Sequence, residues 1–197
     1  MLIQFEEQTL HNFRIPAFTL SQGEILVLDI YGGATFYPLL EELVGLLTGK
    51  IKSDKVRLLS TFTYADHIRK FKRFWIPITV NSYLKRHANP ANSIYEKAFI
   101  DPRVRRKTKI VSLPGNLRRE LAIYTVLSNT NNIIFDLAGV DHEGGVTIYN
   151  NVKEAIDVGG AAILIDTCDE FKNDCTTFVK AEYLGPKIAP LPPFSAK

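Results

Sequence analysis

The sequence predicts an α/β fold with a mostly parallel sheet, and three apolar runs are the main reason. Each run is continuously hydrophobic and carries an aspartate at its end. Parallel strands that are buried on both faces have this composition. The runs are residues 24–30, 132–136 and 161–166.

Helices are expected between the apolar runs. Residues 38–47 and 117–127 carry apolar side chains at the i, i+3, i+4 spacing of an amphipathic helix. Residues 151–158 are a shorter candidate, which Gly159 and Gly160 would end. This alternation of strands and helices is typical of an α/β protein with a mostly parallel sheet.

The middle of the chain differs from the rest because it is basic and aromatic. Residues 68–75 spell IRKFKRFW, and Pro77 and Pro90 interrupt the helical pattern around them. We predict a helical subdomain inserted into the core, and a proline-rich extended tail. The predicted divisions are a core of residues 1–62 and 108–185, a helical subdomain of 63–107, and a tail of 186–197.

Composition narrows the choice of compartment and cofactor. The 197 residues contain no apolar run long enough for a membrane span, and residues 1–6 lack the features of a secretory signal. Cys168 and Cys175 suit free thiols in a reducing compartment, and the four histidines lack metal-ligand spacing. We therefore expect a cytoplasmic protein without a metal or other cofactor. The net charge of +3 is too mild to require an anionic partner.

A series of short motifs suggests a family through its order along the chain. These motifs are residues 23–28 (GEILVL), 29–40, 113–123 (LPGNLRRELAI), 133–136 (IIFD), 138–141 (AGVD) and 159–169. In this order they resemble the ATP-binding domain of ABC transporters. They correspond to the strand before the phosphate-binding loop, that loop and its helix, the signature sequence, the Walker B strand, the D-loop and the switch region. The resemblance implies a P-loop NTPase-like fold over about residues 15–185.

The phosphate-binding loop departs from the family pattern G-x-x-x-x-G-K-[ST]. In that pattern glycines let backbone N–H groups converge on phosphates, and the lysine neutralises their charge. Here Ile30 and Thr35 hold the glycine positions, while Phe36 and Tyr37 hold the positions of the lysine and the hydroxyl residue. We expect poor or absent ATP affinity, although Gly32 and Gly33 leave a small anion nest as an alternative.

Other positions that carry catalysis in the family are also changed. Leu137 replaces the glutamate that acts as general base, and Cys168 replaces the switch histidine. Pro114 replaces the signature serine, and Asn116 replaces a signature glycine. Asp136 is retained, and it either holds Mg²⁺ through water or caps a neighbouring turn.

These changes predict a catalytically inactive ABC ATPase-like subunit that is not an enzyme and acts as a structural or regulatory partner. The expected partners are a second ABC ATPase-like subunit, in a homodimer or heterodimer, and a membrane permease, which would hold the chain at the inner face of the membrane. The expected interface residues are Leu113, Pro114, Gly115, Asn116, Gly139, Asp141, Phe71, Phe74 and Trp75.

Two alternatives stay open. One alternative is a nucleic-acid-binding module. Cations and aromatic side chains alternate in residues 69–75, and cations cluster in residues 103–107, as in proteins that bind single-stranded nucleic acid. The modest net charge and the absence of a specific motif disfavour this nucleic-acid-binding module. The other alternative is a divergent nucleotide-binding ATPase.

Overall fold

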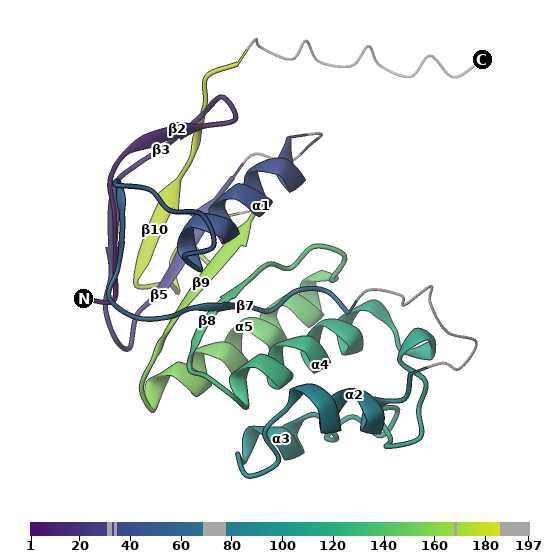
Figure 1. The fold of residues 1–197 in the computed structure, drawn as a ribbon. Helices are drawn as coiled ribbons and strands as arrows, with labels where there is room; N and C mark the ends of the chain where they lie inside the picture. The colour runs from purple at the N-terminus through teal and green to yellow at the C-terminus, as the bar shows by residue number, and fades with distance from the viewer. Residues whose placement is uncertain (31–32, 34, 69–77, 168, 186–197) are drawn as a thin grey trace, which may run out of the picture.

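The computed structural model describes residues 1–30, 33, 35–68, 78–167 and 169–185 (Figure 1). Its centre is a five-stranded sheet in the order β10-β5-β9-β8-β7, and every neighbouring pair in it is parallel. The strands are β5 (Ile25–Asp29), β7 (Thr63–Tyr64), β8 (Asn132–Phe135), β9 (Ala161–Asp166) and β10 (Thr177–Lys180). The predicted α/β class with a mostly parallel sheet is thus confirmed, and the three apolar runs form the three central strands.

Both faces of this sheet are covered, which explains why the runs are continuously apolar. Leu26 and Leu28 of β5 pack into a cluster with α1 (Phe36–Leu47). Their neighbours Ile25 and Val27 point the other way, into a cluster with α4 (Gly115–Leu127) and α5 (His142–Asp157). Alternate side chains of a strand point to opposite faces, so a strand covered on both sides needs apolar residues at every position.

The helix predicted at residues 151–158 begins much earlier in the structure. α5 starts at His142, and the Asp141 side chain caps it by accepting a hydrogen bond of 2.8 Å from Gly144 N. Gly144 weakens the helical pattern in the sequence, because glycine disfavours helix interiors. A Cβ atom at Gly144 would lie 2.6 Å from the Asn116 side chain, so close packing of α5 against α4 accounts for this glycine.

Two small antiparallel sheets lie beside the parallel sheet, and the sequence analysis did not predict their short strands. Their orders are β4-β1-β6 and β11-β3-β2. They bury residues such as Phe5 and Phe13 in the same cluster as α1. The strands are β1 (Ile3–Phe5), β2 (Gln8–Leu10), β3 (Phe13–Ile15), β4 (Phe18–Leu20), β6 (Val56–Leu58) and β11 (Glu182–Tyr183).

The region predicted as helical begins with a strand. Thr63–Tyr64 form β7 at the edge of the parallel sheet, paired with Ile133 and Ile134 of β8. The described helices follow later and pack against α4 in a third apolar cluster. Within the predicted region they are α2 (Val80–His87) and α3 (Ile94–Lys97), and the short 3-10 helix η1 (Ile110–Ser112) follows just after it. Pairing along β8 therefore overrides the basic, aromatic composition at the start of this region.

Some predictions fall outside the described residues. These are the helical pattern of residues 69–75 and the proline-rich tail of 186–197. Within the ranges that the structure describes, no helix is both long and apolar enough to cross a bilayer.

Candidate functional site

The candidate site is the edge of the parallel sheet where its strands end, because ligands of open α/β sheets bind outside the carboxyl ends of the strands. Asp29 ends β5, Asp166 ends β9, and Asp136 directly follows β8. Lys180 Nζ, from the neighbouring β10, lies 2.9 Å from the Asp29 carboxylate. The three apolar runs therefore bring their aspartates to one edge.

Asp136 is fully buried, and both of its carboxylate oxygens have partners. Oδ1 accepts a hydrogen bond of 2.9 Å from Ala138 N and lies 3.0 Å from His67 Nε2. Oδ2 lies 3.0 Å from Arg119 Nη2 and accepts a hydrogen bond from the Tyr64 hydroxyl. The contact with Ala138 is the turn cap that the sequence offered as one alternative for this aspartate.

Arg119 is itself buried and binds more than one group. Its Nε donates a hydrogen bond of 2.9 Å to the Asp136 main-chain carbonyl, and its Nη1 donates to the carbonyl of Ala65. Arg119 belongs to α4, Asp136 follows β8, and Ala65 follows β7. One guanidinium group therefore fastens a helix to the ends of two adjacent strands.

The electrostatics of this cluster favour an ionised aspartate. Burial alone would raise the pKa of Asp136, but the hydrogen bond from His67, the charge of Arg119 and the hydrogen bond from Tyr64 outweigh burial and hold that pKa below its ordinary value. The pKa of Tyr64 is raised, first by burial and then by the Asp136 carboxylate. Tyr64 is therefore a hydrogen-bond donor to Asp136 at all ordinary pH values.

The segment aligned with the phosphate-binding loop lies at the same edge, between β5 and α1. Ile30 is buried. Its N–H continues the hydrogen bonding between β5 and β9, because it donates a hydrogen bond of 2.8 Å to the Asp166 carbonyl. Thr35 is the N-cap of α1 and Phe36 begins the helix with 7% of its surface exposed. Gly33 has φ of 110°, a conformation that favours glycine, while Gly32 lies outside the described residues.

The start of α1 offers few groups to a phosphate. The N–H of Phe36 already donates to the Gly33 carbonyl at 3.1 Å, and Pro38 has no N–H. The Tyr37 ring meets the Phe36 ring edge to face, and the Tyr37 side chain is mostly exposed. A helix start attracts anions through free N–H groups. Among the residues that the structure describes here, Phe36 and Pro38 therefore present no free N–H group, and Asp136 is engaged with protein groups.

The predicted interface residues that the structure describes lie at two turns on this edge. Leu113 is buried, while Pro114 is exposed at the start of α4. Gly139 and Asp141 are exposed in the turn before α5. Leu137, at the position of the catalytic glutamate, is buried in the cluster under α5. Phe71, Phe74, Trp75 and Cys168 lie outside the described residues.

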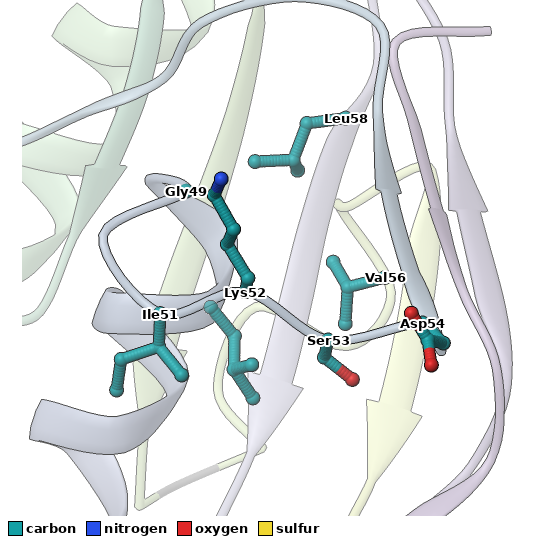
Figure 2. Close-up of a pocket in the computed structure, with 8 residues that line it drawn as sticks. Gly49, Ile51, Lys52, Ser53, Asp54, Val56 and Leu58 are labelled. Carbon is teal, nitrogen blue, oxygen red and sulfur yellow. The ribbon is translucent and has the colours of Figure 1, made fainter.

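A hollow at the opposite end of α1 is not part of this site. It has a volume of about 450 Å³ and lies between the end of α1, the loop after it and β6. Figure 2 shows Lys52, Ser53 and Asp54 on the loop, with Val56 and Leu58 on the strand. It holds no cluster of chemically reactive side chains comparable to that around Asp136.

Comparison with solved structures identifies the fold. A subunit described as the ATP-binding subunit of an ABC transporter has a TM-score of 0.64 at 13% identity, over 91% of this chain and 85% of that chain. CbiO1 of Clostridium perfringens, part of the ABC transporter complex cbiONQ, has a TM-score of 0.61 at 12% identity, over 92% and 85% of the two chains. No family model and no curated protein matches the sequence.

The fold also occurs outside transporters. A chain in the complex of the archaeal ribosomal stalk protein aP1 with the ribosome recycling factor aABCE1 has a TM-score of 0.61 at 13% identity, over 90% of this chain and 38% of that chain. The chain therefore has the ABC ATPase, P-loop NTPase-like fold. The expectation that it is not an enzyme is contradicted, because the solved structures that share this fold are ABC ATPases.

Sequence reasoning found Asp136 but missed the residues that surround it. The sequence places Arg119 only within the signature-like helix, and the predicted helical region includes Tyr64 and His67. One signal was available: a charged residue on a face that otherwise turns toward the core needs a buried partner. Arg119 lies between Leu117 and Leu121, and Asp136 was the aspartate at the end of the adjacent strand.

We predict that Arg119→Met lowers the free energy of unfolding by about 3–5 kcal/mol, because it leaves the buried Asp136 carboxylate without its cationic partner. Arg118→Met is the matched control, since Arg118 is the adjacent residue of α4 and is partly exposed. Its expected effect is within about 0.5 kcal/mol. Urea unfolding measures both variants, and equal losses in the two would contradict the role given to Arg119.

We also predict a loss of stability in acid that involves Asp136. Since the folded protein holds its pKa below the ordinary value, the stabilisation is present above that ordinary value and is lost as pH falls through the folded pKa. Carbon-13 NMR of the aspartate carboxyls, between about pH 5 and pH 2, should show Asp136 titrating below the ordinary value of about 3.9. A midpoint above that value would contradict the ion pair.

Proposed function

We propose that the chain is a subunit of a paired, ABC ATPase-type assembly, joined to a second copy of itself or to another chain of the same fold. One observation carries the proposal: the two exposed turns that correspond to the signature and the D-loop are tied to each other. In the family these segments lie where subunits meet. A surface held in one shape is suited to a lasting interface, because little freedom is lost when it binds.

The tie between the turns is made by Asn116 and Asp141. Asn116 Nδ2 donates a hydrogen bond of 2.7 Å to Asp141 Oδ2, and the Asp141 N–H lies 3.3 Å from Asn116 Oδ1. The backbones also approach closely, since a Cβ atom at Gly115 would lie 3.0 Å from the Gly139 carbonyl. Asn116, which replaces a signature glycine, therefore has a use in joining the two turns.

We further propose that the chain's own phosphate-binding loop contributes little to nucleotide affinity. The support is the arrangement described above: Phe36 in place of a lysine, Pro38 without an N–H, and Asp136 occupied by protein partners. The pair as a whole can still be an ATPase, because subunits of this fold work in pairs and the other subunit supplies its own loop. The chain then acts within an enzyme, as a structural or regulatory partner.

We propose that residues 63–107 form the part that docks on a membrane permease, which would place the chain at the inner face of the membrane. Beyond β7, the described helices of this region share a cluster with α4 and form a unit beside the core. α2 ends in the basic residues Lys85, Arg86 and His87. The core would then consist of residues 1–62 and 108–185, with β7 added to its sheet.

The nucleic-acid alternative gains no support from the described part of the basic region. Arg103 pairs with Asp101 at 2.7 Å, and the Arg106 guanidinium lies 5.1 Å from the centre of the Phe99 ring. These contacts give two of the cations in residues 103–107 an internal role. They are two of the four cations in residues 103–107 that the alternative would use to bind phosphate groups.

The interface can be tested with a photo-reactive amino acid at Pro114, in cells that produce the chain naturally. We expect it to crosslink a second copy or another ABC ATPase-fold chain, which mass spectrometry identifies. The control places the same group at Val158, which is 82% exposed and lies at the opposite end of α5. The proposal is contradicted if the chain with the photo-reactive amino acid at Pro114 crosslinks nothing, or crosslinks only chains of other folds.

The weak nucleotide site can be tested by calorimetry of the isolated chain with ATP and Mg²⁺. We expect a dissociation constant weaker than about 1 mM, because Phe36 stands in place of the lysine and, among the described residues of the loop, the Phe36 N–H is engaged and Pro38 has none. The Tyr37→Ala variant is measured alongside, because it removes an exposed bulky side chain at the loop without changing Asp136. Micromolar binding by the unaltered chain would show that the loop still holds phosphates.

A further inference from the structure

A second cavity lies between residues 97–104 and the helices α4 and α5, and its lining includes Asn116 and Asp141 from the two turns at the sheet edge. Its volume is about 610 Å³, enough for a small organic molecule. Four carboxylates line it, those of Asp101, Glu120, Asp141 and Glu143, against the two cations Lys97 and Arg103. The lining is therefore acidic in a chain whose net charge is +3.

Most of these charges are already compensated within the protein. Arg103 binds both carboxylate oxygens of Asp101, at 3.0 and 2.7 Å. Lys97 Nζ lies 2.8 Å from Glu154, and Asp141 is held by Asn116 and by the start of α5. Arg103, Asp101, Lys97 and Asp141 therefore have local partners, while Glu143 is exposed at the start of α5.

Glu120 differs from the other carboxylates of the lining, because it is partly buried and has no such partner among the described residues. It lies in the middle of α4 and is partly buried. Among the described residues, no hydrogen-bond donor or cation lies within bonding distance of its carboxylate. Burial and the nearby Asp101 raise the pKa of Glu120, and Arg103 opposes them only in part. A carboxylate in this position gains free energy from any cation that enters the cavity.

The surroundings of Glu120 suit an organic cation better than a metal ion. Tyr124 lies one helical turn further along the same face of α4, and Leu117 and Leu121 form apolar parts of the lining. The Tyr124 hydroxyl accepts a hydrogen bond of 2.7 Å from Asn151 Nδ2, which fixes the ring. Within the described ranges, no three His, Cys, Asp or Glu side chains form a metal-binding group.

We infer that this cavity binds a small organic ammonium ion, with the charged amine on Glu120 and the carbon chain along Leu117, Leu121 and the Tyr124 ring. The ammonium group supplies the hydrogen-bond donors that Glu120 lacks. An aromatic ring beside it adds a cation–π attraction. The site lies between α4, α5 and residues 97–104, so a bound ligand would join the helical region to the core.

Calorimetry of the full chain with cadaverine, a linear diamine, tests this inference, with the corresponding linear diol as the uncharged probe. We expect cadaverine to bind at least about tenfold more tightly than the diol, since a charge-assisted hydrogen bond contributes about that factor. Glu120→Gln should remove the difference. Glu41→Gln, at an exposed position of α1, is the matched control and should keep it.

The pH dependence gives an independent readout that does not require a variant. As pH is lowered, Glu120, whose pKa is raised, should take up a proton before Asp101 and Asp141, whose pKa values are lowered, so the first fall of cadaverine affinity reports Glu120, while binding of the diol stays constant. Circular dichroism confirms that both variants are folded. The inference is overturned if cadaverine does not bind, or if Glu120→Gln binds cadaverine as tightly as Glu41→Gln does.

Discussion

The buried ion pair between Arg119 and Asp136 is the constraint on which the arrangement of this protein depends. Charges buried in a protein interior are costly unless hydrogen bonds satisfy them, and here both groups are surrounded by partners. The pair joins α4 to the ends of β7 and β8. In the motif resemblance, the same carboxylate corresponds to the Walker B aspartate. Under the proposed function, Asp136 is used to hold the fold together and is therefore not free to hold a metal ion.

Because Asp136 is used to hold the fold together, the fold of this chain does not by itself indicate its chemistry. At the sheet edge, Phe36, Leu137 and Asp136 all face protein, whereas the turns around Pro114 and Gly139 face outward. A fold can host many functions, and the function must be argued from its sites. We propose that the function of this chain lies in contacts with other subunits and, in the cavity around Glu120, in binding a small organic cation.

The central part of the fold could be predicted from the sequence because its signals are local. Three continuous apolar runs and two periodic helices specify strands and helices by composition and spacing alone. The short antiparallel strands and β7 could not be predicted, since strands of two or three residues are selected by their partners and carry no period of their own. The same holds for the site. Asp136 was visible at the end of an apolar run, but Tyr64 and His67 come from a distant segment that only the pairing of β7 with β8 brings close.

The strand order has a consequence for how the chain is made. β5 lies between β9 and β10, so an early segment is hydrogen-bonded on both sides by segments from late in the chain. During synthesis both hydrogen-bonding edges of β5 stay unpaired until the two later strands have left the ribosome. Contacts between distant segments form slowly, and exposed apolar strands aggregate. α1 and the N-terminal strands β1–β4 share an apolar cluster with one face of β5, so they can cover that face before the later strands are made.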